Sequence, residues 1–400
     1  MSEKIQPKVR FFGFTDAWEQ RKLETLGSTY SGLSGKSKED FGHGNAKFVT
    51  YMNVFQNSIS SSKMLEKVEV DSKQNQVKRG DVFFTTSSET PDEVGMSSVW
   101  QFEINNTYLN SFCFGWRPKA NVFNSKFLAY ILRAPSLRLR LNVLAQGISR
   151  YNISKKALMK EKIYKPSLPE QTKIGELLST IDSLIAANQS KLEELKTVKK
   201  LAMQKIFDQE WRFKGFTDPW EQRKAKALFM NISKKGSTNL PVLSVTQENG
   251  VILRDDLDID VKYDKNSLTN YKIVNSGNFI ISLRSFQGGF ELSNLCGITS
   301  PAYTILALQH LKEHDKCFWK YFFKTNTFIE SLKKVTFGIR DGRSISYQNF
   351  STLKLKFPTK NEQVQIGELL STLDSLIAAN QQKCDQLKKI KKWCMQNLFV

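Results

Sequence analysis

The segment SLRSFQGG in the second half of the chain carries side chains whose types suit hydrogen bonding to nucleic-acid bases. The forked guanidinium of Arg284 matches the two acceptors of guanine, the amide of Gln287 matches adenine, and the hydroxyl of Ser285 can bond to either. The adjacent Gly288 and Gly289 would let the backbone come close to a ligand. The sequence therefore predicts a base-reading loop here.

A second turn, GIRDGRSIS, adds the cations Arg340 and Arg343. The corresponding places in the first half of the chain hold further candidate base contacts: Thr85, Thr86, Ser87, Ser88, Ser149, Arg150, Tyr151 and Asn152. Basic pairs predict phosphate contacts, which position a protein on nucleic acid without reading sequence: Lys78, Arg79, Lys155, Lys156, Lys234 and Lys235. For each single residue, an ordinary solvated turn is the alternative interpretation.

Catalytic and metal sites are weaker hypotheses. The run DIDVK (Asp258, Asp260, Lys262) contains a fragment of a nuclease pattern, but short acidic runs produce it by chance. His310, His314 and Cys317 have the spacing of one helical face, as a metal site could require, but no fourth ligand is near in sequence. We find no glycine-rich cofactor loop after a strand and no Asn-Pro-Pro-Tyr-like motif. We therefore expect no catalytic residue, no bound metal and no cofactor in this chain.

The elements that would position these residues occur in the same order in both halves. A polar turn leads into an apolar strand at residues 78–88 and again at 274–285, and each strand ends in polar residues at the candidate loops. Aromatic and aliphatic spacing predicts packed helices at 127–135 and 318–326. Pro169 and Pro358 precede a long helix in each half. Mixed helices and strands in this order predict α+β globules.

Two phrases recur almost unchanged. FGFTDAWEQRK begins at Phe12 and GFTDPWEQRK at Gly215, while IGELLSTIDSLIAANQ begins at Ile174 and returns at Ile366 with one change, Ile181 to Leu373. The segments between the phrases differ. The chain therefore consists of two equivalent halves, and its 400 residues exceed what one core usually supports.

Composition indicates a polyanionic partner. The net charge is +20, and residues 1–208 (31 Lys and Arg, 21 Asp and Glu) and 209–400 (28 and 18) contribute +10 each. Such an excess on a folded chain favours nucleic acid. We see no signal peptide and no apolar run of membrane-spanning length, so we expect a cytoplasmic protein. The five cysteines show no paired spacing and are expected to be reduced.

The repeated helices have an apolar heptad stripe. With Ile174 at position a, the predicted interface consists of a and d residues of both copies: Ile174, Leu177, Ile181, Leu184, Asn188, Leu195, Ile366, Leu369, Leu373, Leu376, Asn380 and Leu387. Because a lone helix cannot cover such a stripe, the natural partner is the other copy. Antiparallel pairing would bring Asn188 and Asn380 together, although parallel pairing would also match them. Lys199, Lys200, Lys391 and Lys392 are interpreted as solvated faces or partner contacts.

These motifs together resemble the DNA-specificity subunit of type I restriction-modification systems, over nearly the whole chain. The resemblance rests on the repeated tryptophan phrase, the Glu-Gln entry to each long helix and the Leu-rich helix in that order. It implies two pseudo-symmetric target recognition domains joined by an antiparallel coiled coil. The expected boundaries are 1–168 and 209–358 for the recognition domains, and 169–208 and 359–400 for the helices.

The resemblance also implies the partners. These are double-stranded DNA with a bipartite, asymmetric target, two modification subunits that bind S-adenosylmethionine and methylate adenine, and restriction subunits that use ATP and Mg²⁺. The segments between the repeats would differ because they read different bases. An autonomous DNA-modifying enzyme and a protein-binding coiled-coil scaffold are the alternatives.

Overall fold

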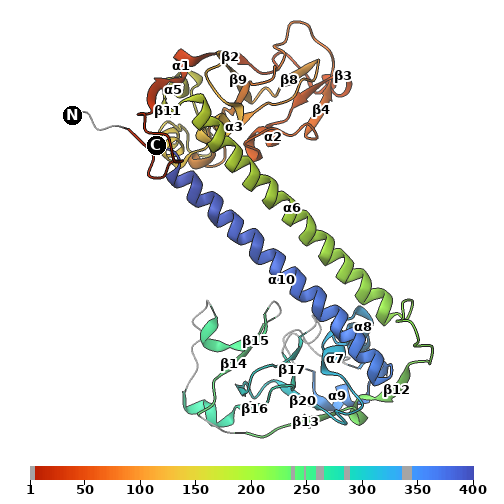
Figure 1. The fold of residues 1–400 in the computed structure, drawn as a ribbon. Coiled ribbons are helices and arrows are strands. Elements are labelled where there is room, and N and C mark those ends of the chain that lie inside the picture. The colour runs from red at the N-terminus through yellow and green to blue at the C-terminus, as the bar shows by residue number, and fades with distance from the viewer. Residues whose placement is uncertain (1–4, 236–238, 247–248, 258–264, 283–288, 336–344) are drawn as a thin grey trace. The chain divides into compact units, whose positions relative to one another are not determined.

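The computed structural model describes residues 5–235, 239–246, 249–257, 265–282, 289–335 and 345–400. The chain forms two compact units, one containing residues 1–189 and 382–400 and the other residues 190–381. Each unit combines a globule with one half of each long helix, α6 (Leu168–Phe207) and α10 (Lys360–Asn397) (Figure 1). Among the described helices, none is both long and apolar enough to cross a membrane.

Both globules are built on the same four-stranded antiparallel sheet. The order β2-β9-β5-β7 in the first unit matches β13-β20-β17-β18 in the second. The strands are β2 (Gly27–Ser31), β9 (Cys113–Pro118), β5 (Val82–Thr85), β7 (Ser97–Val99), β13 (Phe229–Ile232), β20 (Thr304–Leu308), β17 (Phe279–Ile281) and β18 (Phe290–Leu292). The predicted core strands β5 and β17 lie inside these sheets, which confirms the α+β class.

Helices cover each sheet in equivalent positions. The predicted helices are α3 (Ser125–Ile131) and α7 (Lys316–Phe322), and their aromatic residues are buried except for Phe322, which is half-buried. They are followed by α4 (Pro135–Val143) and α5 (Lys155–Met159) in the first unit, and by α8 (Asn326–Val335) and α9 (Tyr347–Thr352) in the second. A short strand, β11 (Lys162–Lys165) or β21 (Lys354–Phe357), then leads into the long helix.

The remaining elements differ between the units. The first has α1 (Leu23–Leu26), α2 (Tyr51–Gln56), a sheet of β3 (Phe41–Val49), β4 (Leu65–Val68) and β8 (Thr107–Leu109), and the pair β6 (Ser87–Ser88) and β10 (Tyr151–Asn152). The second has two pairs: β14 (Leu243–Thr246) with β15 (Gly250–Leu253), and β16 (Lys272–Val274) with β19 (Gly297–Thr299). The non-repeated segments therefore elaborate a common sheet differently.

The repeated tryptophan phrase pairs with the strand that leads into each long helix. Its EQRK residues form β1 (Glu19–Lys22), which pairs with β11, and β12 (Glu221–Lys224), which pairs with β21. Trp18 is buried edge-to-face against Phe127, with ring centroids 6.0 Å apart, and Trp220 packs in the same way on Phe318 at 5.8 Å. Each tryptophan therefore attaches the repeated phrase to α3 or α7, the helix that packs against the long helices.

The Glu-Gln pair at the start of each long helix is buried and fully engaged. Arg10 donates from Nε and Nη2 to Glu170 at 2.7 and 2.8 Å, and Arg212 binds Glu362 in the same way at 2.7 Å for both contacts. One residue later, Gln171 and Gln363 each accept from the backbone N–H that precedes α3 or α7 by one residue, and donate to the carbonyl of the proline before the helix.

The glycine of IGELL allows α3 or α7 to approach the long helix closely. A Cβ at Gly175 would lie 2.6 Å from the backbone nitrogen of Phe127, and one at Gly367 would lie 2.9 Å from Cβ of Cys317. Such distances are shorter than van der Waals contact, so a larger residue would push α3 or α7 away from the long helix. Glycine is unfavourable inside a helix by about 1 kcal/mol relative to alanine. Its presence at both positions therefore follows from packing.

Within each unit, half of α6 packs antiparallel against half of α10. In the first unit, Ile174, Leu178 and Ile181 of α6 share a core with Cys394 of α10 and with Leu398, which directly follows α10. In the second unit, the C-terminal half of α6 (Leu195, Ala202, Ile206) meets the N-terminal half of α10 (Ile366, Leu370, Leu373). The predicted a residues are thus buried, except that Leu387, Asn188 and Asn380 are half-buried.

The predicted d positions are different. Leu177, Leu184, Leu369 and Leu376 are 36–45% exposed, and the e residues Leu178 and Leu370 are buried in their place. The buried face of each long helix is rotated relative to the predicted a/d stripe. The reason is that α3 or α7 also packs on the two long helices, on the side away from the d residues. The side-chain amides of Asn188 and Asn380 donate to the backbone of their own helices, at Leu184 O and Leu376 O. The asparagine pair is therefore not what fixes the register.

Candidate nucleic-acid interface

A hairpin of the first unit brings two of the predicted base-reading segments together. Gln146 and Asn152 exchange both backbone hydrogen bonds, at 2.9 and 2.8 Å, and close the loop 147–151. Strand β10 then pairs antiparallel with β6, so that Tyr151 lies opposite Ser88 and Asn152 opposite Ser87. The segments 85–88 and 149–152, which are far apart in sequence, thus form one surface.

Only part of that surface is accessible. Ser149, Arg150 and Asn152 are exposed and Tyr151 is half-buried. The Arg150 guanidinium lies 6.0 Å from the ring centroid of Phe112, which is itself 55% exposed. An arginine held over an aromatic ring keeps its hydrogen-bond donors available at the edge of the ring. These residues remain candidates for contact with a base or phosphate.

The hydroxyl residues of β5 and β6 are engaged inside the globule. Thr85, Ser87 and Ser88 are buried, and Thr86 donates to the Phe112 carbonyl at 2.8 Å. Thr85 accepts from Met96 N, and Ser88 donates to Glu93. The prediction that these side chains contact a ligand stays a prediction, but Ser87 and Ser88 are only 5% and 6% exposed in this structure. Periodicity did not reveal the pairing of β6 with β10, because that pairing joins segments far apart in sequence.

The predicted phosphate contacts lie on the surface. Lys78, Arg79, Lys155 and Lys156 are exposed in the first unit, and Lys234 and Lys235 in the second. Lys155 and Lys156 begin α5, directly after the hairpin. Their exposure is compatible with phosphate contacts. The candidates Arg284, Ser285, Gln287, Arg340 and Arg343 lie outside the described residues, as do those of the DIDVK run.

The histidine and cysteine spacing does not form a helical face. Residues 311–313 form a turn, and α7 begins only at Lys316. His314 is buried against Phe357 and Trp319, and burial lowers the pKa of its imidazole below its ordinary value. No group of three or more His, Cys, Asp or Glu side chains suited to a metal occurs in the part of the chain that the structure describes.

An ion-pair motif missed by the sequence prediction fixes the helices to each other and to the globule. Asp182 of α6 binds Lys391 Nζ of α10 at 2.5 Å and accepts from the Tyr130 hydroxyl of α3 at 2.9 Å. The second unit repeats this with Asp374, Lys199 and Tyr321, at 2.5 and 2.7 Å. Lys199 and Lys391 therefore hold the two long helices together, whereas the sequence suggested solvated faces or partner contacts.

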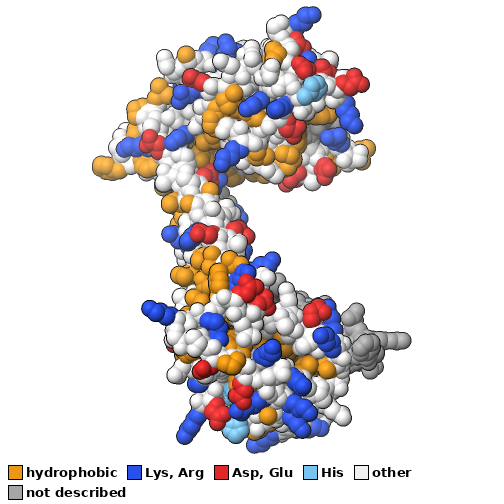
Figure 2. Space-filling view, turned by 90° about the vertical axis from the view of Figure 1, so that its right-hand side faces the viewer, with side chains coloured by type: hydrophobic (Ala, Val, Ile, Leu, Met, Phe, Trp, Pro, Cys, Tyr) orange, Lys and Arg blue, Asp and Glu red, His pale blue; other side chains and the backbone are white. Residues whose placement is uncertain are grey.

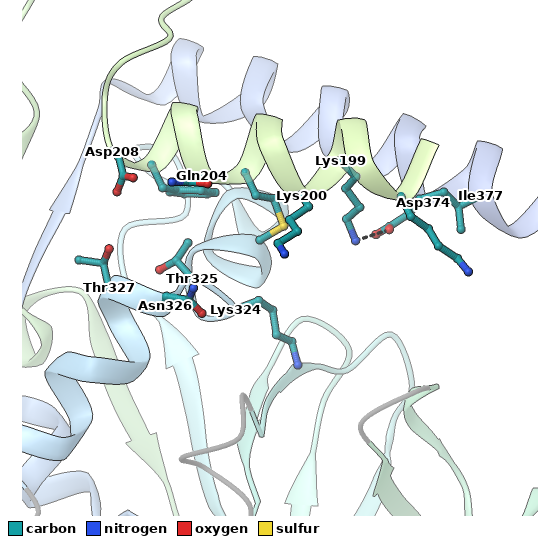
Figure 3. A pocket seen from close by; sticks show the side chains of 13 residues that line it. Lys199, Lys200, Gln204, Asp208, Lys324, Thr325, Asn326, Thr327, Asp374 and Ile377 are labelled. Carbon is teal, nitrogen blue, oxygen red and sulfur yellow. Dashed lines mark ion pairs between the residues drawn. The ribbon is translucent and has the colours of Figure 1, made fainter. Parts of the chain in front are cut away.

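Lys199 and Asp374 also line a groove in the second unit, between α6 and the turn from α7 to α8. The groove has a volume of about 670 Å³. Figure 3 shows the ion pair at one end of it and Thr325, Asn326 and Thr327 toward the other. Of its lysines, Lys324 binds Glu291 and Lys196 binds Glu193. The groove thus contains mostly paired charges. The sequence contains a signal for this ion-pair motif. An Asp directly follows an a residue at the same place in both long helices, and a Tyr lies three residues after the first aromatic residue of α3 and of α7.

The second accessible surface is the exposed apolar stripe on the long helices. We define this d-stripe as four equivalent residues in each unit: Leu177, Leu184, Ile390 and Trp393 in the first, and Leu369, Leu376, Val198 and Leu201 in the second. Hydrophobic side chains gather along the helix surface in the space-filling view (Figure 2). The same large apolar positions are therefore exposed in both units.

Comparison with known proteins agrees with the repeated architecture. Residues 15–197 and 209–389 each match the model of the type I restriction modification DNA specificity domain. The chain is 24% identical to the MjaX type I restriction enzyme specificity subunit of Methanocaldococcus jannaschii, over 96% of this chain and 93% of that protein. It is also 24% identical to the MjaVIII specificity subunit of the same organism, over 70% and 71%.

The fold has a solved counterpart. The crystal structure of a type I restriction-modification S subunit from M. genitalium is similar with a TM-score of 0.64, at 15% identity, over 99% of both chains. Identity at this level extends the likeness to the fold and not to individual side chains. The match includes both globules and both long helices.

Proposed function

Because the chain belongs to the family of type I restriction-modification DNA-specificity subunits, we propose that it reads a bipartite, asymmetric DNA sequence with one globular unit per half-site. The observation that carries this proposal is that both units share one set of structural contacts, which we call the frame, and differ in the elements built on it. Trp18 and Trp220, and the ion pairs Arg10–Glu170 and Arg212–Glu362, are equivalent, whereas the additional sheets differ. Equivalent frames with different readers suit a target made of two different parts.

The d-stripe supports the proposed partners. Two modification subunits would each cover one copy of the stripe, since the same four apolar positions are exposed in both units. In this proposal the chain is non-catalytic and holds no cofactor. The modification subunits bind S-adenosylmethionine and methylate adenine, and restriction subunits that use ATP and Mg²⁺ cleave unmodified DNA.

Co-expression with a modification subunit, followed by mapping of methylated adenines across a genome, tests this function. We expect a split motif with two short specific parts. Arg150→Ala and Arg284→Ala form a matched pair, because each lies in a predicted reading loop of a different half. We expect each variant to relax a different part of the motif.

An unsplit motif, or equal loss of both parts in both variants, would contradict one reader per unit. Methylation or cleavage by the purified chain alone would instead select an autonomous enzyme. A chain that shows no salt-sensitive binding to one short bipartite duplex, even with its modification subunits, would favour a protein scaffold.

A further inference from the structure

The hairpin 146–152 holds an isoleucine out in water at its tip. Ile148 is 95% exposed, and it is the second residue of the loop that Gln146 and Asn152 close. Most large apolar side chains of this globule lie in its cores. A single exposed isoleucine is ordinary on a protein surface. A rigid support beneath it makes this one different.

The loop is held in one conformation from both sides. Gly147 has φ of +141°, and a Cβ there would meet the Arg150 carbonyl oxygen at 2.0 Å, so glycine is required for the loop to close. Below the loop, Ile153 N donates to Thr86 O at 3.0 Å and continues the pairing of β10 with β6. The backbone that carries Ile148 is therefore held in place, which lowers the conformational cost of binding.

The groups beside Ile148 are those that accompany an inserted side chain in nucleic-acid complexes. Arg150 stacks on Phe112, and the backbone of Phe112 is fixed by Asn110 Oδ1 at 2.8 Å and by Thr86. Proteins that bend DNA insert apolar side chains between base pairs and place cations on the adjacent groove or phosphates. Ile148, two residues before an arginine held over the Phe112 ring, matches that arrangement.

Charge around the hairpin limits how DNA could approach. The exposed Lys155 and Lys156 follow the hairpin and favour phosphate, whereas Glu89, Asp92 and Glu93 follow Ser88 at the other strand of the pair. Carboxylates repel phosphate, so the base of the hairpin on that side is unsuited to the DNA backbone. The tip is the part that can enter a groove.

We propose that Ile148 is an apolar wedge that the first unit inserts at a base step of its half-site, with Arg150 on the adjacent base edge or phosphate. This inference rests on the proposed function. Insertion unstacks one step and bends the duplex, so it selects steps that deform easily. The Gly-Ile pair recurs in sequence as Gly338 and Ile339, before Arg340.

The test uses the full chain assembled with its modification subunits and a duplex carrying its mapped motif. The duplex has 2-aminopurine at successive positions of the half-site read by the first unit, because this base fluoresces more when it is unstacked. We compare Ile148→Ser with Val143→Ser, a control that removes an exposed apolar side chain from α4, outside the hairpin.

We expect the wild-type complex and Val143→Ser to raise the fluorescence at one step, and Ile148→Ser to lose that rise. Affinity for the specific duplex should fall by roughly tenfold in Ile148→Ser, as expected for one apolar side chain that is no longer buried. Thermal unfolding should not change, because the side chain touches little in the free protein.

Unchanged affinity and fluorescence in Ile148→Ser, with a wild-type complex that recognises its split motif, would overturn the wedge alone. Loss of the modification subunits from Ile148→Ser, with DNA unstacking retained in the complexes that remain, would show that the tip docks protein. A wild-type complex that recognises no split motif would refute the proposed function itself.

Discussion

Removal of Arg212 tests whether the repeated frame stabilises each globule. Its partner Glu362 is 1% exposed, and both carboxylate oxygens are bound by the guanidinium. Arg212→Ala would leave a buried, unpaired carboxylate, which costs about 3–5 kcal/mol. The arginine itself is 20% exposed, so water can reach part of the gap, and we expect a value near the lower limit of that range.

The expected loss translates into a clear thermal shift. For a unit of this size, each kcal/mol lowers the melting temperature by about 2–4 °C, so a loss of about 3 kcal/mol gives a shift of about 6–12 °C. Calorimetry measures the shift, and hydrogen exchange of peptides from residues 190–381 shows whether it belongs to the second unit. Exchange in the first unit should stay unchanged.

Two controls separate this effect from loss of any arginine. Arg223 forms an exposed ion pair with Glu221, and Arg223→Ala should cost less than about 1 kcal/mol. The double change Arg212→Met and Glu362→Leu removes both charges and should recover most of the loss, since apolar replacements of buried pairs are often neutral. The reasoning is refuted if Arg212→Ala destabilises no more than Arg223→Ala does.

Three further outcomes follow from single contacts. Burial lowers the pKa of His314, so the folded state favours the neutral imidazole. The free energy of unfolding should therefore decrease as pH falls below about 6.5, by up to about 1.4 kcal/mol per pH unit. His314→Phe, which copies Phe123 of the first unit, should remove most of this pH dependence in urea unfolding between pH 7.5 and 5.5, and a persistent slope would point to another group. Asp182→Lys and Lys391→Asp should each destabilise by roughly 1–3 kcal/mol and partly restore each other when combined, whereas additive losses in a double-mutant cycle would mean that the pair is uncoupled. Gly175→Ala should lower the melting temperature, because overpacking costs about 1–3 kcal/mol and outweighs the better helix propensity of alanine. A stabilised variant would show that α3 can move.

The frame was predictable from the sequence because it is repeated. The phrases around Trp18 and Trp220 mark the same structure twice, and the two predicted core strands and packed helices occur where the pattern placed them. The rotation of the seam was not predictable, because heptad spacing describes two helices alone. The hydroxyl of Tyr130 on Asp182 shows why: a third helix shares the pair, and e residues are buried instead of d.

The candidate site was predictable only in part, for a related reason. Arg150 and Asn152 were expected at a turn and are exposed there. Ser87 and Ser88 were expected to contact a ligand, but they are buried in β6, which pairs with β10 more than fifty positions away in sequence. Periodicity predicts which side of a strand is apolar, but it does not predict which distant segment pairs at its end. The exposed Ile148 was missed because it follows a glycine in a segment interpreted only as a turn with polar candidate contacts.

The near-identity of the two helix segments has a cause beyond internal packing. Ile174 and Ile366 fill the seam, and Asp182 and Asp374 bind the globule, so these positions are fixed from inside. Other matched positions are exposed in both copies and contact no core: Glu176 and Glu368, Thr180 and Thr372, Leu184 and Leu376. The globules have diverged, so shared ancestry alone does not keep solvent-facing residues alike. The proposed modification subunits, each covering the same face of one copy, would keep these residues alike, and the d-stripe lies on that face.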